Sequence, residues 1–154
     1  MTPRQLLADA LGVPVRRVRR DEFGDLMATT GRVRWTLYAH SLSANAGQHW
    51  VSISITRRRP ILAAVVLARA GLEAMGARVP LILRWTGDTL YARRVGDPRG
   101  LVGYAVGHHV RVYQMTRDGH VTRAIRDNND DPRAGLLAML ATYYPGVPVV
   151  EVKG

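Results

Sequence analysis

Cysteine is absent from this 154-residue chain and lysine almost so, because Lys153 is the only lysine among 22 basic residues. The lack of cysteine excludes disulfides, thiolate zinc sites, iron–sulfur clusters and a cysteine nucleophile. Long apolar runs are also missing: the longest, residues 61–75, contains Arg69 and Glu73 and is shorter than the roughly 18–20 residues that cross a bilayer. The opening residues have no apolar stretch after a basic start, so we expect no secretory signal and a cytoplasmic or virion-associated protein.

Arginine supplies nearly all of the positive charge, and against 12 acidic residues it leaves a formal net charge of +10. A guanidinium group stays ionised and presents a planar fork of donors that matches phosphate or carboxylate. The composition therefore predicts an anionic partner, either nucleic acid or an acidic protein surface. A G+C-rich genome also favours arginine codons over lysine codons, so composition by itself names no activity.

The N-terminal segment has residues that typically start and end short helices. Thr2 is suited to capping a helix, Pro3 to its first position and Gly12 to its end, and residues 15–27 have the length of a second short helix. A helix-turn-helix that reads DNA is one interpretation of this pair, but a plain two-helix arm fits better because no third supporting helix follows. We expect one domain, residues 1–154, with this arm in residues 1–30 and an α+β core in residues 31–154.

Alternation of apolar and polar residues predicts strands over most of the remaining chain. Three hairpins are expected, with further strands at residues 101–106 and 147–152; the hairpin strands are residues 33–39 with 51–55, 79–85 with 89–94, and 110–117 with 120–126. Helices are expected at residues 60–75 and 132–144. The predicted fold class is α+β, a mainly antiparallel sheet of six to seven strands with these two helices packed on one face.

The helix at residues 60–75 is apolar on every side apart from Arg69 and Glu73. Such a helix must be covered over most of its surface, so it is either the central core helix or the seam of a homodimer. Three arginines precede it, against the preference of a helix start for negative charge. A bound phosphate would relieve that conflict, and so would simple screening by solvent.

The hairpin around Asp118-Gly119 has the clearest local signal, because this dipeptide favours a two-residue type I′ turn. The turn pairs residue 115 with 122, 113 with 124, and 111 with 126, and it directs Val112, Val121 and Ile125 to the core. The other face then carries Arg111, Tyr113, Met115, Arg117, His120 and Arg126. Arg111 and Arg126 repel each other at this register unless an acid or a phosphate bridges them.

The first hairpin has a similar outer face, with Arg34, Tyr38, His40 and Trp50 among hydroxyl-bearing residues. Exposed aromatic rings between cations stack bases and neutralise phosphates in proteins that bind single strands. The alternative is that a helix covers this face and packs against its aromatic residues.

Catalytic and metal-binding patterns are weak. His108 and His109 are adjacent and point to opposite faces of a strand, and capping and turn formation account for Asp127, Asp130 and Asp131. The glycine-rich residues 96–107 lack the lysine and hydroxyl residue of a phosphate-binding loop. We therefore expect no catalytic residues, no metal and no cofactor.

The leading interpretation is a non-enzymatic nucleic-acid-binding protein, such as a DNA-associated protein of a phage or another mobile element. One alternative is a protein-interaction module, a host-factor inhibitor or virion component, that binds an acidic surface. Another is a small phosphodiesterase or nuclease that uses His and Asp. The predicted contact residues are Arg16, Arg17, Arg19, Arg20, Arg34, Tyr38, Trp50, Arg57, Arg58, Arg59, Arg111, Tyr113, Arg117, His120 and Arg126.

Overall fold

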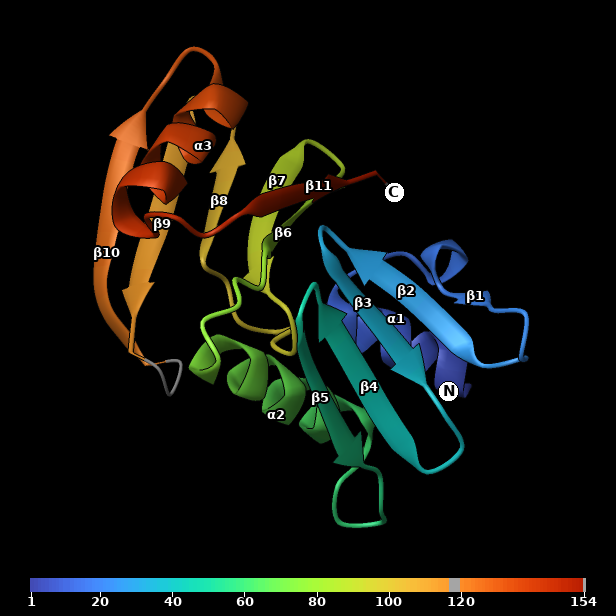
Figure 1. Cartoon of the computed structure of the whole chain (residues 1–154). Coiled ribbons are helices and arrows are strands. Elements are labelled where there is room, and N and C mark those ends of the chain that lie inside the picture. The colour runs from blue at the N-terminus through green and yellow to red at the C-terminus, as the bar shows by residue number, and fades with distance from the viewer. Residues whose placement is uncertain (117–119, 154) are drawn as a thin grey trace.

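The computed structural model describes residues 1–116 and 120–153, which form two β-sheets and three α-helices (Figure 1). The first sheet runs in sequence order: β1 (Arg19–Arg20), β2 (Leu26–Thr30), β3 (Val33–Leu37), β4 (Ser41–Ala46) and β5 (His49–Ser54). The second has the order β10 (Val121–Asn128), β9 (His109–Met115), β8 (Gly103–Val106), β7 (Thr89–Arg94), β6 (Leu81–Thr86) and β11 (Val149–Val152). The helices are α1 (Pro3–Leu11), α2 (Ile61–Ala74) and α3 (Pro132–Tyr143), and η1 (Val15–Arg17) is a 3₁₀ turn.

The predicted α+β class and the mainly antiparallel pairing are confirmed, since among the described strands only β11 runs parallel to its neighbour, β6. The single sheet of six to seven strands is wrong, because the chain forms two sheets of five and six strands. The first predicted hairpin is also wrong, because β4 lies where the sequence predicted a loop, so β3 and β5 pair with β4 and not with each other. The small polar residues of β4 have weak strand propensity, but β3 and β5 pair with it on both sides while Leu42 and Ala44 are buried.

The two-helix N-terminal arm is also wrong. Thr2 and Gln5 form a capping box at the start of α1, and Gly12 ends the helix at a φ of 77°. The expected second helix is instead η1 followed by β1 and β2, which pair as antiparallel strands. Leu26 and Ala28, at alternate positions of β2, are buried, and β2 packs against α1. This burial favours a strand at the end of a segment whose sequence was also compatible with a helix.

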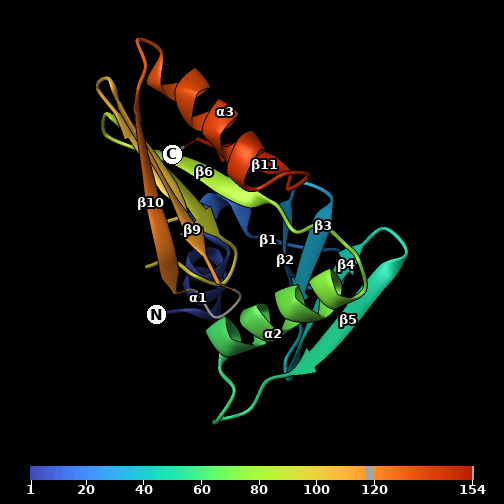
Figure 2. The same cartoon turned by 90° about the vertical axis from the view of Figure 1, so that its left-hand side faces the viewer.

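The helices cover different sheets rather than one face of a single sheet. In Figure 2, α1 and α2 lie against one face of the first sheet, and α3 lies on the opposite side of the molecule against the second sheet. Trp35 and Leu72 belong to the first core cluster, and Leu83 and Leu136 belong to the second. Ile82, from the second sheet, packs in the first cluster, so the two sheets share part of one core.

Helix α2 is covered on one side only within the chain, so it is not a core helix buried on all sides, and the homodimer seam stays a prediction. Ala64, Ala68 and Leu72 are fully buried, whereas Leu62 and Leu67 are 43% and 44% exposed. Within residues 1–116 and 120–153, no helix combines the length and apolar character needed to cross a membrane.

The β9–β10 hairpin keeps the predicted register near its open end, with Tyr113 opposite Ala124 and Arg111 opposite Arg126. A bulge between Val121 and Arg123 shifts the pairing nearer the turn, so Met115 lies opposite Val121 rather than residue 122. Val121 is consequently 56% exposed instead of entering the core, and Met115 packs partly against the second cluster instead of facing outward. The predicted turn at Asp118-Gly119 lies outside the described residues.

Candidate nucleic-acid interface

Each sheet has one face that the helices leave largely open, although the end of α1, at Asp9 and Gly12, lies beside Ile82, Arg84 and Arg93 at the β6–β7 end of the second sheet. Because α1 and α2 cover the first sheet from one side and α3 covers the second sheet from the other, the two open faces point in opposite directions (Figure 2). The alternative in which a helix covers the Arg34, Tyr38 and Trp50 face is therefore wrong. Aromatic and basic side chains occupy both open faces, but they are arranged differently on each.

The open face of the second sheet carries a row of side chains that crosses five adjacent strands. Cross-strand pairing places Arg84 of β6 beside Tyr91 of β7, Tyr91 beside Tyr104 of β8, Tyr104 beside Arg111 of β9, and Arg111 beside Arg126 of β10. With neighbouring strands about 4.8 Å apart, the row extends for roughly 19 Å. Together with Arg93 and Tyr113 on the same face, these residues form what we call the tyrosine–arginine face.

The tyrosine rings and guanidinium groups of this face are in contact. Arg93 lies over the ring of Tyr91, 4.7 Å from its centre, and Arg111 lies 5.8 Å from the ring centre of Tyr104. Both distances are within the range of cation–π attraction. Arg111 also donates a hydrogen bond to the Tyr113 hydroxyl at 3.4 Å, which raises the pKa of the Arg111 guanidinium above its ordinary value. These contacts hold planar groups and positive charge together on the open face.

The β9 and β10 side of the same face is hollowed. A depression of about 590 Å³ lies between these strands and is lined by Tyr104, His109, Val110, Arg111, Arg126, Asp127 and Asn128. At its far end the His109 imidazole is within 3.2 Å of the Asn128 side-chain oxygen. The arginine pair that sequence reasoning placed opposite each other therefore lies at the rim of a depression open to ligands.

The open face of the first sheet carries Arg34, Tyr38 and Trp50 among serines and threonines. Trp50 is 59% and Tyr38 44% exposed, and the Trp50 indole donates a 2.9 Å hydrogen bond to the Ser43 hydroxyl. Residues 26–54, which include β2 to β5, contain no acidic residue. This face resembles a stacking surface, but it has fewer arginines than the tyrosine–arginine face.

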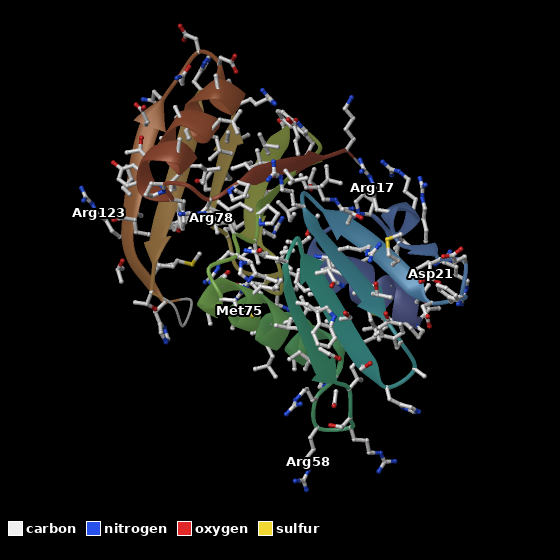
Figure 3. All side chains as sticks on the ribbon, in the orientation of Figure 1. Arg17, Asp21, Arg58, Met75, Arg78 and Arg123 are labelled. Atoms are coloured by element: carbon white, nitrogen blue, oxygen red, sulfur yellow. The ribbon has the colours of Figure 1, made fainter. Side chains whose placement is uncertain are left out.

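The remaining predicted contact residues are dispersed. Arg17 and Arg58 lie at separate ends of the molecule, and both are far from Arg123 of β10 (Figure 3). In the arginine group of residues 16–20, Arg16 donates a hydrogen bond to the Lys153 carbonyl and Arg20 donates one to the Gly24 carbonyl, each at 2.7 Å. The structure therefore does not bring Arg16, Arg17, Arg19 and Arg20, or Arg57, Arg58 and Arg59, onto the tyrosine–arginine face.

The β9–β10 turn supplies no further contact to this face from the described residues. Arg117 lies outside them, and the His120 backbone amide bonds the Thr116 hydroxyl at the end of the hairpin. Among the histidine, aspartate and glutamate residues that are described, no three are grouped as a metal site would require. Asp131 caps α3, as predicted, by accepting a hydrogen bond from the Ala134 amide.

Sequence reasoning missed Arg84, Tyr91, Arg93 and Tyr104. The local signal was present, because Tyr91 and Arg93 alternate with buried residues in β7. The cross-strand neighbour of Tyr91 could not be read from that alternation, since it depends on which strand lies beside β7. Comparison of the chain with protein-family models, curated proteins and solved structures finds no match of any of the three kinds.

Proposed function

We propose that the protein binds single-stranded nucleic acid on the tyrosine–arginine face. The observation that carries the proposal is the row from Arg84 to Arg126, in which two tyrosines are cross-strand neighbours and arginines flank them on both sides. Unpaired bases stack on aromatic rings or guanidinium planes, and arginines neutralise the phosphates between the bases. Tyr91 and Tyr104 would each stack one base.

A single strand fits this face better than a duplex. Duplex readout places a helix or a two-stranded ribbon in a groove, whereas α1, α2 and α3 each pack on a sheet and present no row of arginines. The tyrosine rings and most of the guanidinium groups of this face are half-buried, and their accessible sides offer planar surfaces for stacking, which requires unpaired bases. Stacking on aromatic rings tolerates every base, so we expect weak sequence preference.

Tyrosine substitutions test the proposal most directly. Tyr91→Ala and Tyr104→Ala should each weaken the binding of a fluorescein-labelled oligo(dT), measured by anisotropy, by about 5- to 150-fold, which corresponds to roughly 1–3 kcal/mol per stacked base. Tyr91→Phe should retain most of the affinity, because the ring remains. Tyr38→Ala removes an exposed tyrosine from the other sheet and serves as the matched control.

The competing functions give different results in the same assay. If an acidic protein surface is the partner, polyglutamate should displace oligo(dT) efficiently and the two tyrosine substitutions should matter little. If the protein is a nuclease, the labelled strand should shorten when Mg²⁺ is added. Equal losses for Tyr104→Ala and Tyr38→Ala would refute the assignment of binding to this face.

A further inference from the structure

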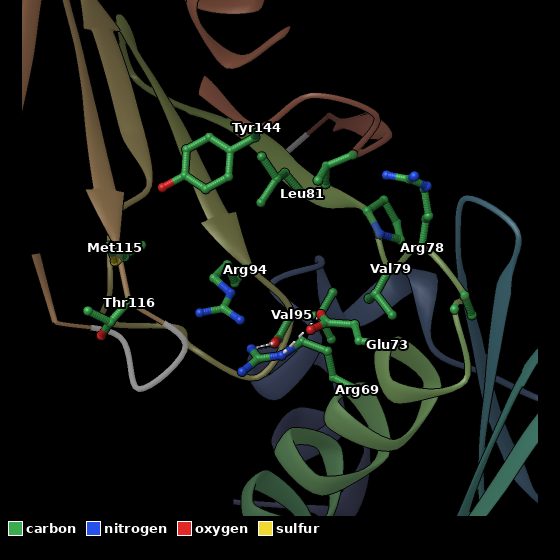
Figure 4. A pocket seen from close by; sticks show the side chains of 14 residues that line it. Arg69, Glu73, Arg78, Val79, Leu81, Arg94, Val95, Met115, Thr116 and Tyr144 are labelled. Carbon is green, nitrogen blue, oxygen red and sulfur yellow. Dashed lines mark hydrogen bonds and ion pairs between the residues drawn. The ribbon is translucent and has the colours of Figure 1, made fainter. Parts of the chain in front are cut away.

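A second candidate binding site lies on the other side of the second sheet, between the two sheets. A cavity of about 440 Å³ opens where the end of α2, the start of β6, the end of β7 and the end of α3 meet (Figure 4). It is on the side of the second sheet that α3 covers, so it is separate from the tyrosine–arginine face. Its size is within the range of pockets that hold small organic ligands.

Three arginines line this cavity. Arg69 projects from α2, Arg94 from the end of β7 and Arg78 from the segment before β6, and Figure 4 shows Arg69 and Arg94 close together on one wall with Arg78 on another. Among the described lining residues Glu73 is the one acid. Three guanidinium groups and one carboxylate leave a formal charge of +2 around one small space.

Only 9% of the surface of Arg69 is exposed, and its guanidinium has two protein groups beside it. One terminal nitrogen of its guanidinium donates to the Val95 carbonyl. The Nε lies 3.7 Å from a Glu73 carboxylate oxygen, too far for a hydrogen bond, and has no hydrogen-bond partner among the described residues. Burial, and then the charge of Arg94, lower the pKa of the Arg69 guanidinium, with a partial offset from Glu73 and Asp97. Two like charges are thus held near each other in a poorly solvated place, which an anion would stabilise.

Apart from Thr116 and the Tyr144 hydroxyl, the remaining side chains of the cavity wall are apolar. Val79, Pro80, Leu81, Met115 and Val147 contribute to it, and Tyr144 lies along it with its hydroxyl donating to the Tyr113 carbonyl. A site that combines guanidinium groups with apolar side chains matches an anion that carries an organic body rather than an inorganic ion.

We propose that this cavity binds a small phosphomonoester whose organic part is aromatic or apolar, such as a nucleoside monophosphate. A phosphomonoester dianion balances the +2 charge of Arg69, Arg78, Arg94 and Glu73. Its oxygens accept the forked hydrogen bonds that arginine donates. The organic part packs against Leu81, Met115 and the Tyr144 ring.

Calorimetric titration of the full chain with AMP, with adenosine and with inorganic phosphate tests the proposal. AMP should bind, adenosine should bind far more weakly because it lacks the charge, and inorganic phosphate should bind more weakly than AMP because it lacks the body. Arg94→Gln should weaken AMP binding by about 10- to 100-fold, the effect of losing hydrogen bonds to a charged group. Arg57→Gln removes the same charge from a distant exposed loop and should leave the affinity unchanged.

Arg94 is the better target than Arg69, whose substitution also breaks contacts that hold α2 to Val95. Affinity for AMP should fall as the pH drops below the second pKa of the phosphate, about 6, because the ligand then loses a charge. The double variant Arg111→Ala/Arg126→Ala should leave AMP binding intact, while Arg94→Gln should leave oligo(dT) binding intact. If AMP binding survives Arg94→Gln, or is lost in the double variant instead, the proposal of a phosphomonoester site in this cavity is wrong. Either result would leave the separate proposal of nucleic-acid binding to be judged by the oligo(dT) assay.

Discussion

The salt dependence of oligonucleotide binding is the sharpest quantitative consequence of the tyrosine–arginine face. Each phosphate that the protein neutralises on a single strand changes the slope of log affinity against log salt by about −0.7. The face carries Arg84, Arg93, Arg111 and Arg126, and three to four contacts give a slope of roughly −2 to −3. Replacing Arg111 and Arg126 together by alanine should flatten the slope by about 1.4 units.

The matched control uses the arginine cluster that the structure places elsewhere. Arg57→Ala/Arg58→Ala changes the net charge by the same amount, but both residues lie in the exposed loop before α2. This control should therefore lower affinity slightly, through the general field, and leave the slope nearly unchanged.

Anisotropy titrations of labelled oligo(dT) over a series of NaCl concentrations measure both slopes, and melting curves check the fold. Neither double variant should change the melting temperature by much, because Arg126, Arg57 and Arg58 are exposed and Arg111 is only half-buried. Equal flattening by the two variants would mean that binding depends on net charge and that the face has no special role.

Two further predictions concern stability and assembly. Glu151 accepts hydrogen bonds from Trp85 and Arg133, and the bond from Arg133 is the main reason that the pKa of Glu151 is lowered. Glu151→Ala should lower the free energy of unfolding by about 1–2 kcal/mol after allowance for partial exposure, and each kcal/mol lowers the melting temperature by about 2–4 °C. Glu151→Gln should have a smaller effect. Because the pKa is lowered in the folded state, the advantage of the wild type over Glu151→Gln is present at neutral pH and disappears as the pH falls through that lowered pKa; a pH-independent difference in calorimetry would contradict this. The exposed apolar side of α2 predicts self-association, so light scattering at high concentration should find twice the 17.0 kDa chain mass, and Leu62→Glu/Leu67→Glu should restore the single chain. A 17.0 kDa species alone for the wild type would refute the dimer.

Several elements were predictable because short-range chemistry decides them. Pro60 directly precedes α2 and Gly76 follows its end, while Asp131 caps α3 and Pro132 takes its first position, as their preferences at helix ends favour. The hairpin of β6 and β7 turns at Gly87, which adopts a φ of 61°. The pairing of Arg111 with Arg126 also followed from local pattern.

Other elements were unpredictable because their conformation depends on distant residues. Ser41–Ala46 is a poor strand former that becomes β4 since two strands saturate its backbone and Leu42 fills the core. Val121 matched the core pattern, but the bulge that follows it turns its side chain to solvent.

The amino-acid sequence by itself determined the α+β class, most helix and hairpin bounds, and the arginine-rich character of the surface, because propensity, capping and alternation act over a few residues. Only the tertiary structure decided that there are two sheets, and that Tyr91 and Tyr104 are neighbours while residues 57–59 stand apart. It also decided that Arg69, Arg78 and Arg94, from three different segments, line one cavity. Strand order and the burial of a charge depend on which surfaces meet, and such long-range contacts cannot be recognised from the alternation of residues along the sequence.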